Sequence, residues 1–393
     1  MQAFDYQLRP RILFGANCID QLGVLAKELD STRVLLVSDP GVVQAGIFDR
    51  GRESLQNAHL QVVGFHSFTE NPSTRHVDDG VQVAKSFRPD LIVGLGGGSS
   101  MDCAKGINFI YSCGGRIHDY WGVGKATGPL LPMIAIPTTA GTGSETQSFA
   151  LISDSETHVK MACGDPRAAC RIAMLDPVLT LTQPARVTAL TGIDALTHAL
   201  ETFVCNRRNP MSECYSLEAW RRLTSGFSRV IHHPMDLQAR GDMLLGAAFA
   251  GMAIEASMLG AAHALANPLT ANLGTPHGQA VGLMMPHVIR FNSPVVGDRY
   301  ETLMKNAAHP GSAGVPPAEQ LAGQMTHWLS EAGLATTLRQ LEGWPSDATE
   351  SDSLLRTLAS GAVKQWTAGF NPRSVSEADM LDLYQLALAS PQS

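Results

Sequence analysis

The chain of 393 residues changes character near residue 184. Before that point, short runs that are apolar throughout alternate with segments whose apolar residues recur three and four positions apart. The apolar runs cover residues 33–38, 60–65, 90–95 and 132–136, and the segments with helical spacing cover 41–57 and 74–88. Strands without a polar face, alternating with helices, are typical of a parallel sheet covered on both sides. Residues 148–175 predict a hairpin and a last strand at 171–176.

After Pro184 the sequence becomes rich in Ala, Leu and Met with helical periodicity, as in 186–203, 212–231, 237–259 and 317–333. We therefore predict an α/β plus all-α protein. Residues 1–183 form a Rossmann-like, parallel-sheet dinucleotide-binding domain, and residues 184–393 form a helical domain. The Gly- and Pro-rich piece at 309–317 predicts an exposed loop between helices.

Composition narrows the classes of partner and site. A hydrophobic share of 44% and a charged share of 17% are typical of an ordinary globular protein. A net charge of −7 disfavours nucleic acid and anionic membranes as partners. The first residues lack an apolar region of the signal-peptide type, so we expect a cytoplasmic location. The seven cysteines show no CxxC spacing. Any metal should therefore be held by His and carboxylate side chains.

Two glycine-rich turns follow predicted strands. Residues 90–105 read DLIVGLGGGSSMDCAK, and residues 137–145 read PTTAGTGSE. The first turn alone is explained equally well by a tight strand-to-helix connection or by a phosphate-binding turn. Two such turns at the ends of neighbouring strands favour a dinucleotide crevice. Asp39 also follows a strand, where it either accepts a hydrogen bond from a ribose hydroxyl or simply begins an Asp-Pro-Gly turn.

A second set of residues predicts a metal site. Asp194 and His198 lie four residues apart on one face of a predicted helix with apolar neighbours. A buried Asp–His hydrogen bond explains that pair by itself at least as well as a metal does. His263 and His277 lie in two further segments rich in small and apolar residues, and the four together favour a shared site. One Asp and three His suit Fe²⁺ or Zn²⁺ better than Ca²⁺ or Mg²⁺.

These motifs together resemble the iron-containing (group III) alcohol dehydrogenases, whose architecture is that of dehydroquinate synthase. The resemblance extends over essentially the whole chain. It includes Phe14-Gly15, Asp39-Pro-Gly, Asn71-Pro72, GGGSSMDCAK, PTTAGTGSE, Asp176-Pro177, GIDALTHALE, residues 259–278, Pro286-His287 and Asn371-Pro372-Arg373.

The resemblance implies an active site in a cleft between an N-terminal nucleotide-binding domain and a C-terminal helical domain. It implies one divalent ion, with Fe²⁺ favoured and Zn²⁺ the alternative, held by Asp194, His198, His263 and His277. It implies cofactor contacts from Asp39, Gly97, Gly98, Ser99, Asp102, Thr138, Thr139, Phe149 and Lys160. An Asp at position 39 accompanies NAD preference in the family, with NADP the alternative, and members often form homodimers or larger homo-oligomers.

Two positions depart from the family pattern. Ser100 stands where Pro is usual, a change that should be harmless in a turn entering a helix. Asn267 stands where many members carry a second His near the substrate. Asn cannot titrate near neutral pH, although it can orient a substrate hydroxyl by hydrogen bonding. We therefore expect proton transfer without a residue at position 267.

The predicted reaction is hydride transfer between a metal-bound alcohol or alcoholate and the nicotinamide, with aldehyde reduction as its reverse. Small apolar residues near His263 favour a short or medium aliphatic alcohol. The alternatives are a glycerol-type dehydrogenase, a metal-dependent lyase of the dehydroquinate synthase type, and a non-catalytic nucleotide-binding protein. The metal-binding segments are poor in Lys and Arg, which argues against a phosphorylated substrate and so against the lyase.

Overall fold

A computed structural model describes residues 3–157, 159–308 and 314–388. The chain divides into two compact units at the junction of Gln183 and Pro184. The α/β unit begins at Gln7, whereas residues 3–6 group with the helical unit. The predicted domain of 1–183 and this unit thus share their end and differ in their first residues. A tertiary contact accompanies this grouping, since the Tyr6 hydroxyl hydrogen-bonds with the Tyr215 hydroxyl of the helical unit at 2.6 Å.

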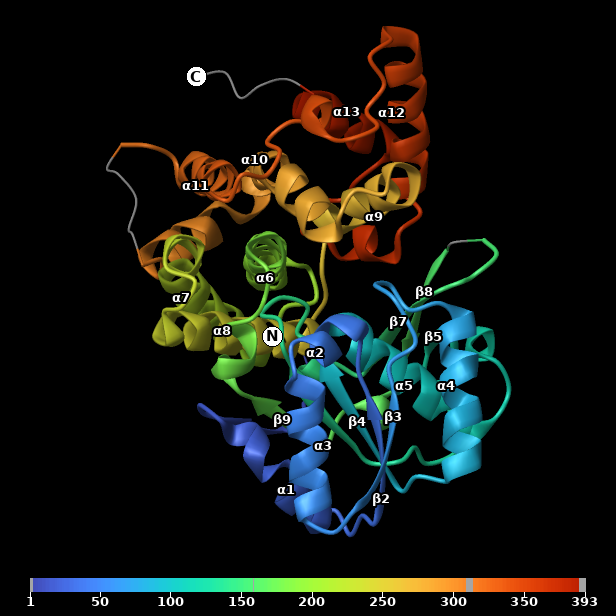
Figure 1. The fold of residues 1–393 in the computed structure, drawn as a ribbon. Helices are drawn as coiled ribbons and strands as arrows, with labels where there is room; N and C mark the ends of the chain where they lie inside the picture. The colour runs from blue at the N-terminus through green and yellow to red at the C-terminus, as the bar shows by residue number, and fades with distance from the viewer. Residues whose placement is uncertain (1–2, 158, 309–313, 389–393) are drawn as a thin grey trace. The chain divides into compact units, whose positions relative to one another are not determined.

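The α/β unit is built on a six-stranded sheet in which every neighbouring pair is parallel. Its order is β1 (Arg11–Phe14), β9 (Ile172–Leu175), β6 (Met133–Pro137), β4 (Leu91–Gly96), β2 (Arg33–Val37) and β3 (Gln61–Phe65). This order confirms the Rossmann-like prediction (Figure 1). The short edge strand β1 was not predicted, because its residues are partly exposed and lack a clear pattern.

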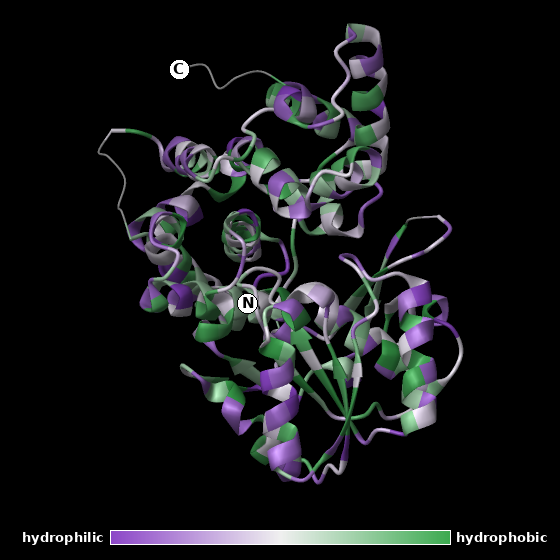
Figure 2. Cartoon of the chain, in the orientation of Figure 1, coloured by the Kyte–Doolittle hydropathy of each residue, from purple (hydrophilic) through white to green (hydrophobic). Residues whose placement is uncertain are grey.

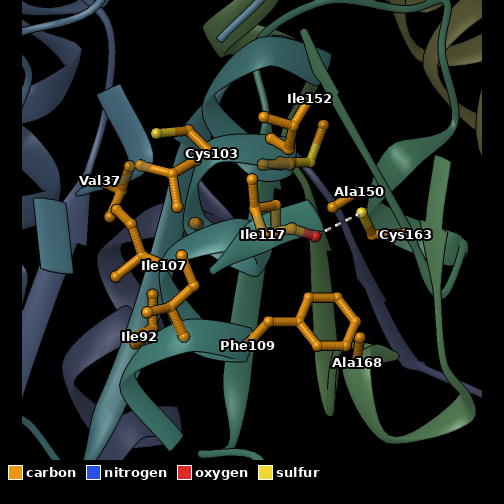
Figure 3. Packing of buried hydrophobic residues seen from close by; sticks show 14 of the residues in the cluster. Val37, Ile92, Cys103, Ile107, Phe109, Ile117, Ala150, Ile152, Cys163 and Ala168 are labelled. Atoms are coloured by element: carbon orange, nitrogen blue, oxygen red, sulfur yellow. Dashed lines mark hydrogen bonds between the residues drawn. The ribbon is translucent and has the colours of Figure 1, made fainter. Parts of the chain in front are cut away.

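Helices cover both faces of this sheet, so alternate strand residues enter two separate cores. Val34 and Leu36 pack with α1 (Leu22–Glu28) and α3 (Ile47–Asn57). Leu35 and Val37 pack with α4 (Thr74–Phe87) and α5 (Gly98–Cys113). Figure 3 shows the second core, where the Cys163 thiol also donates a hydrogen bond to the Ile117 carbonyl. Figure 2 shows hydrophobic residues along the strands and hydrophilic residues on the outer side of α3.

Two details differ from or add to the predicted elements. The predicted helix at 41–57 is two helices, α2 (Pro40–Gln44) and α3, because Gly46 adopts a left-handed φ of 74° between them. The predicted hairpin is present as β7 (Phe149–Ser153) paired antiparallel with β8 (Lys160–Gly164). The short strand β5 (Gly122–Val123) completes this second sheet.

The helical unit contains no strand among its described residues. Its helices are α6 (Ala185–Val204), α7 (Pro210–His232), α8 (Leu237–Ala256), α9 (Ala261–Leu273), α10 (His277–Lys305), α11 (Pro317–Glu331), α12 (Ala348–Ala362) and α13 (Glu377–Leu388). The predicted loop at 309–317 lies mostly outside the described residues. In the described ranges no single helix is long and apolar enough to cross a membrane, and only α8 and α9, bent by 105°, meet that test as a pair.

Candidate functional site

One face of α6 carries three buried polar side chains. Asp194, His198 and Glu201 follow one another at helical spacings of four and three residues, so they lie along one line of the helix. All three are buried, and Glu201 is only 2% exposed. Burying such groups is unfavourable unless each finds a partner. The α6 face therefore requires complementary groups from elsewhere in the helical unit.

The beginnings of α9 and α10 supply two of these groups. The Nε2 atoms of His198, His263 and His277 lie 3.3, 3.5 and 3.8 Å from the same Oδ1 atom of Asp194. Ligand atoms from Asp194, His263 and His277 all lie within 4.8 Å of one another, whereas the predicted ligand His198 is not in this group and is tied to it through Asp194. Asp194, His198 and His263 are buried, whereas the His277 side chain is 32% exposed, so the cluster reaches solvent through His277.

Glu201 fixes the orientation of His263. Its Oε2 atom lies 2.6 Å from Nδ1 of His263, and its Oε1 atom accepts the backbone N–H of Ala262 at 2.7 Å. With Nδ1 donating to Glu201, the Nε2 atom of His263 points toward Asp194. A carboxylate behind a metal-binding His commonly sets its ring orientation in this way. Glu201 was missed from the sequence, although its spacing from His198 on a predicted helix was a usable signal.

Close backbone packing brings α10 to α6. A Cβ at Gly278 would lie 2.1 Å from the carbonyl oxygen of Leu190 on α6, so this position tolerates no side chain. The start of α9 is held differently. The side chain of Asn371, from the Asn-Pro-Arg motif near the end of the chain, accepts the backbone N–H of Ala261 at 3.3 Å and exchanges hydrogen bonds with Asn292. Together these contacts position His263 and His277 opposite Asp194.

Three observations show that the residues fit a divalent ion. An ion with tetrahedral bonds of about 2.1 Å separates its ligands by roughly 3.4 Å. The distances from Oδ1 of Asp194 to the three Nε2 atoms, 3.3–3.8 Å, are close to this value. The buried Oδ1 of Asp194 and Nε2 of His263 have no hydrogen-bond partner among the described residues. Finally, the cluster favours positive charge. Burial opposes ionisation, yet the neighbouring imidazoles hold the pKa of Asp194 well below its usual value, and Glu201 and Asp194 raise the pKa of His263 to about 9.

The predicted nucleotide residues gather at the carboxyl ends of three adjacent strands of the α/β unit. Asp39 follows β2 and caps α2, Gly97 and Gly98 begin α5 after β4, and Thr138 and Thr139 follow β6. The chain runs from β2 to β3 in one direction and returns through β4 in the other, so the strand order reverses between β2 and β4. Open α/β sheets bind nucleotides at such a point.

The turns also contact one another. The backbone N–H of Thr138 donates to the Gly96 carbonyl at 2.9 Å. A Cβ at Gly98 would lie 2.7 Å from the Thr142 methyl, so the second turn packs against the first. Ser99 and Lys160, two other residues predicted to contact the cofactor, are linked through Asn71. The backbone N–H of Asn71 donates to the Ser99 hydroxyl, and the Asn71 side chain accepts a hydrogen bond from Lys160. Phe149 lies at the start of β7, where a Cβ on Gly164 would meet its ring.

A buried lysine ties the second turn to α5. The Lys105 ammonium group is fully buried and donates to the carbonyl oxygens of Ser144, Gln147 and Phe149 at 2.6–2.9 Å. The Ser144 hydroxyl donates to Asp102 at 2.6 Å, and burial raises the pKa of Asp102 against the opposing charge of Lys105. In this structure Asp102 holds the loop, and its contact with cofactor stays a prediction. Lys105 was not singled out from the sequence.

Two family models match the two parts of the chain. The sequence model of the iron-containing alcohol dehydrogenase family matches residues 9–177. The sequence model of the C-terminal domain of that family matches residues 188–388. The chain belongs to the iron-containing alcohol dehydrogenase family. It is 31% identical over 388 residues to 1,3-propanediol dehydrogenase of Klebsiella pneumoniae, covering 98% of both chains. It is 29% identical over 388 residues to NAD-dependent methanol dehydrogenase of Bacillus methanolicus, covering 98% and 100%.

A solved structure extends the similarity to three dimensions. The crystal structure of 1,3-propanediol oxidoreductase matches with a TM-score of 0.93 and 31% identity, covering 98% of this chain and 100% of that one. The protein is thus a metal-dependent, NAD-linked alcohol dehydrogenase. Membership in this family favours a dehydrogenase over the lyase and non-catalytic alternatives.

Within this alcohol dehydrogenase, the Asn267 side chain is held by a neighbouring residue. Asn267 lies on α9 one turn after His263, and its side-chain N–H₂ donates to the Gln365 side chain at 2.9 Å. That bond turns the carbonyl oxygen of the amide away from Gln365, leaving it as an acceptor. The neighbouring Ala261, Ala262, Ala264 and Ala266 are fully buried in the helical core. Their small size therefore reflects helix packing and gives no direct information on the substrate.

Proposed function

We propose that the enzyme interconverts short primary alcohols or diols and their aldehydes, with NAD as cofactor and one Fe²⁺ held by Asp194, His198, His263 and His277. The observation that carries the proposal is the buried cluster in which three imidazole nitrogens face one carboxylate oxygen within 3.8 Å. One charge and three neutral donors suit Fe²⁺, while Zn²⁺ is the alternative with the same ligand preference.

The bound ion supplies Lewis acidity, which favours ionisation of the alcohol hydroxyl near neutral pH. The protein residues supply the remaining functions. Asp194 and the three histidines fix the position of the ion, and Glu201 keeps His263 in the tautomer that points Nε2 into the cluster. The partly exposed edge at His277 is the side from which a substrate can reach the cluster. Asn267 offers its amide to orient the substrate hydroxyl.

The α/β unit supplies the cofactor side of the reaction. Glycines at the start of α5 allow a pyrophosphate to approach the free N–H groups of the helix. Asp39 follows β2, where a carboxylate accepts hydrogen bonds from ribose hydroxyls and repels a 2′-phosphate. These features favour NAD over NADP. A short substrate is favoured by the names of two relatives, which are a propanediol and a methanol dehydrogenase.

A substrate screen tests this proposal. Protein stripped of metal is loaded separately with Fe²⁺ and Zn²⁺, and NADH absorbance is followed with methanol, ethanol, butanol, 1,3-propanediol, glycerol and the matching aldehydes. We expect the highest kcat/KM for a short primary alcohol or diol with NAD, in the Fe²⁺-loaded enzyme. A preference for glycerol would contradict the proposed substrate class, a preference for NADP the proposed cofactor, and higher activity with Zn²⁺ the proposed metal. Cytoplasmic location and assembly as a homodimer or larger homo-oligomer stay predictions.

A further inference from the structure

The carboxylate of Asp39 is held from two sides before any cofactor binds. Its Oδ1 atom accepts the backbone N–H of Val42 at 3.1 Å, which caps α2. Its Oδ2 atom accepts the hydroxyl of Ser100, on α5, at 2.9 Å. A carboxylate has about four acceptor sites, so roughly two remain for ribose hydroxyls. The side chain is therefore oriented without being saturated.

The Ser100 hydroxyl contacts the Asp39 carboxylate and is not exposed to a ligand. Ser100 is fully buried, so its hydroxyl cannot reach a bound nucleotide, whereas Asp39 is partly exposed. Gly96 makes the contact possible. A Cβ there would lie 2.3 Å from the Ser100 hydroxyl oxygen and 2.9 Å from Oδ2 of Asp39. The missing side chain of Gly96 thus provides the space in which the two groups meet.

The same junction is braced by a second hydrogen bond. The buried Ser38 hydroxyl, one residue before Asp39, donates to the carbonyl of Leu95 at 2.7 Å. The end of β2 is therefore fixed to the end of β4 at the point where the strand order reverses. With the backbone held by Ser38, the direction of the Asp39 side chain depends on Ser100 and Val42.

We propose that Ser100 is a positioning residue that sets cofactor specificity, by holding the Asp39 carboxylate in the direction that binds the NAD ribose and excludes a 2′-phosphate. Without the hydroxyl, Asp39 gains rotational freedom. It then loses part of its interaction with NAD, and it can turn away from the phosphate of NADP. The effect falls on cofactor binding rather than on hydride transfer. This inference rests on the NAD preference proposed above.

A double-mutant cycle tests the inference. In Ser100→Ala, we expect KM for NAD to rise on the order of three- to tenfold, kcat to stay within about twofold, and the NAD/NADP ratio of kcat/KM to fall by a similar factor. In Asp39→Ala, the ratio should fall further. In the double variant, Ser100→Ala should add nothing, because its effect passes through Asp39.

Other outcomes separate the possible failures. If the unmodified enzyme prefers NADP, the proposed cofactor preference is wrong, and this inference is wrong with it. If the enzyme prefers NAD but Ser100→Ala leaves KM and the ratio unchanged, only the role of Ser100 is wrong. An equal loss with both cofactors, or an added loss in the double variant, would show that Ser100 merely stabilises the start of α5. Ser112→Ala is the matched control, since that hydroxyl bonds Asn108 near the far end of α5.

Discussion

Glu201 shows how one residue behind a ligand can decide whether a metal site works. Its charge faces Nδ1 of His263 at 2.6 Å in a fully buried position. Glu201→Gln keeps the size of the side chain but removes the charge that holds the ring and increases its basicity. We expect metal affinity to fall roughly 10- to 100-fold. Competition with a chromogenic chelator for Zn²⁺ measures this directly.

The control for that measurement is Glu301→Gln, which neutralises a half-exposed carboxylate on α10. It should leave the affinity for Zn²⁺ unchanged. Equal affinities in Glu201→Gln and the unmodified enzyme would mean that His263 keeps its orientation without Glu201, which would contradict the role assigned to this carboxylate.

Asn267 allows a test of the proton route. Because an amide does not titrate near neutral pH, Asn267→Ala should raise KM for the alcohol and leave the pH profile of kcat and the solvent isotope effect unchanged. Asn272→Ala, an exposed position on the same helix, serves as the control. A selective loss of the proton-transfer step, with metal and cofactor binding intact, would show that Asn267 takes part in it.

For single residues, the sequence predicts the metal ligands better than it predicts the residues that hydrogen-bond to and support the site. Asp194 and His198 were found because helical spacing places them on one face, and His263 and His277 were found from their segments of small and apolar residues and from the resemblance. Glu201 was missed because its partner lies 62 residues away. Lys105 was missed for a similar reason, since its acceptors are backbone carbonyls of a loop about 40 residues later. The spacing of Glu201 from His198 indicated a shared helix face, but the partners of Glu201 and Lys105 become visible only when the chain is folded.

At the scale of elements, the loop after β6 carries a titratable group with an unusual environment. Burial raises the pKa of Glu145 from its ordinary 4.5 to about 7, against the opposing charge of Lys105. The folded α/β unit therefore binds this proton more tightly than the unfolded chain does. Its contribution to stability is complete below pH 4.5 and is lost as the pH rises through about 7. The loss amounts to about 3 kcal/mol.

Glu145→Gln removes this titration while keeping the shape of the side chain. Between pH 5 and 8 the variant should lose less stability than the unmodified enzyme, and above pH 8 it should be the more stable of the two. Amide hydrogen exchange in β4 and β6, compared between the two proteins at each pH, reports the stability of this unit. Parallel pH profiles would contradict the assigned role of Glu145.

The elements themselves were largely predictable, since buried strands and amphipathic helices leave strong patterns. The central strands β2, β4, β6 and β9 agree with the predicted runs within one or two residues. The break between α2 and α3 was missed because apolar spacing continues across Gly46, whose left-handed backbone ends the first helix. The edge strand β1 lacks a buried run and acquires its conformation by pairing with β9.

For the whole molecule, the two units divide the chemistry. The α/β unit holds the predicted nucleotide turns, and the helical unit holds Asp194, the three histidines and Glu201. Every predicted metal ligand therefore belongs to the helical unit. The sequence indicates the boundary near residue 183 through a change from strand-helix alternation to helical periodicity. The grouping of residues 3–6 with the helical unit could not be predicted, because it involves a tertiary contact at Tyr6.

The central claim is that alcohol oxidation depends on one ion bound at Asp194 and the three histidines. The most direct measurement titrates Fe²⁺ into chelator-stripped protein under anaerobic conditions, with NAD and 1,3-propanediol present, while NADH formation is recorded. We predict no activity without metal, full activity at one equivalent, and no recovery in Asp194→Ala, which still binds NAD. Full activity in the stripped protein, or equal recovery in Asp194→Ala, would contradict the account.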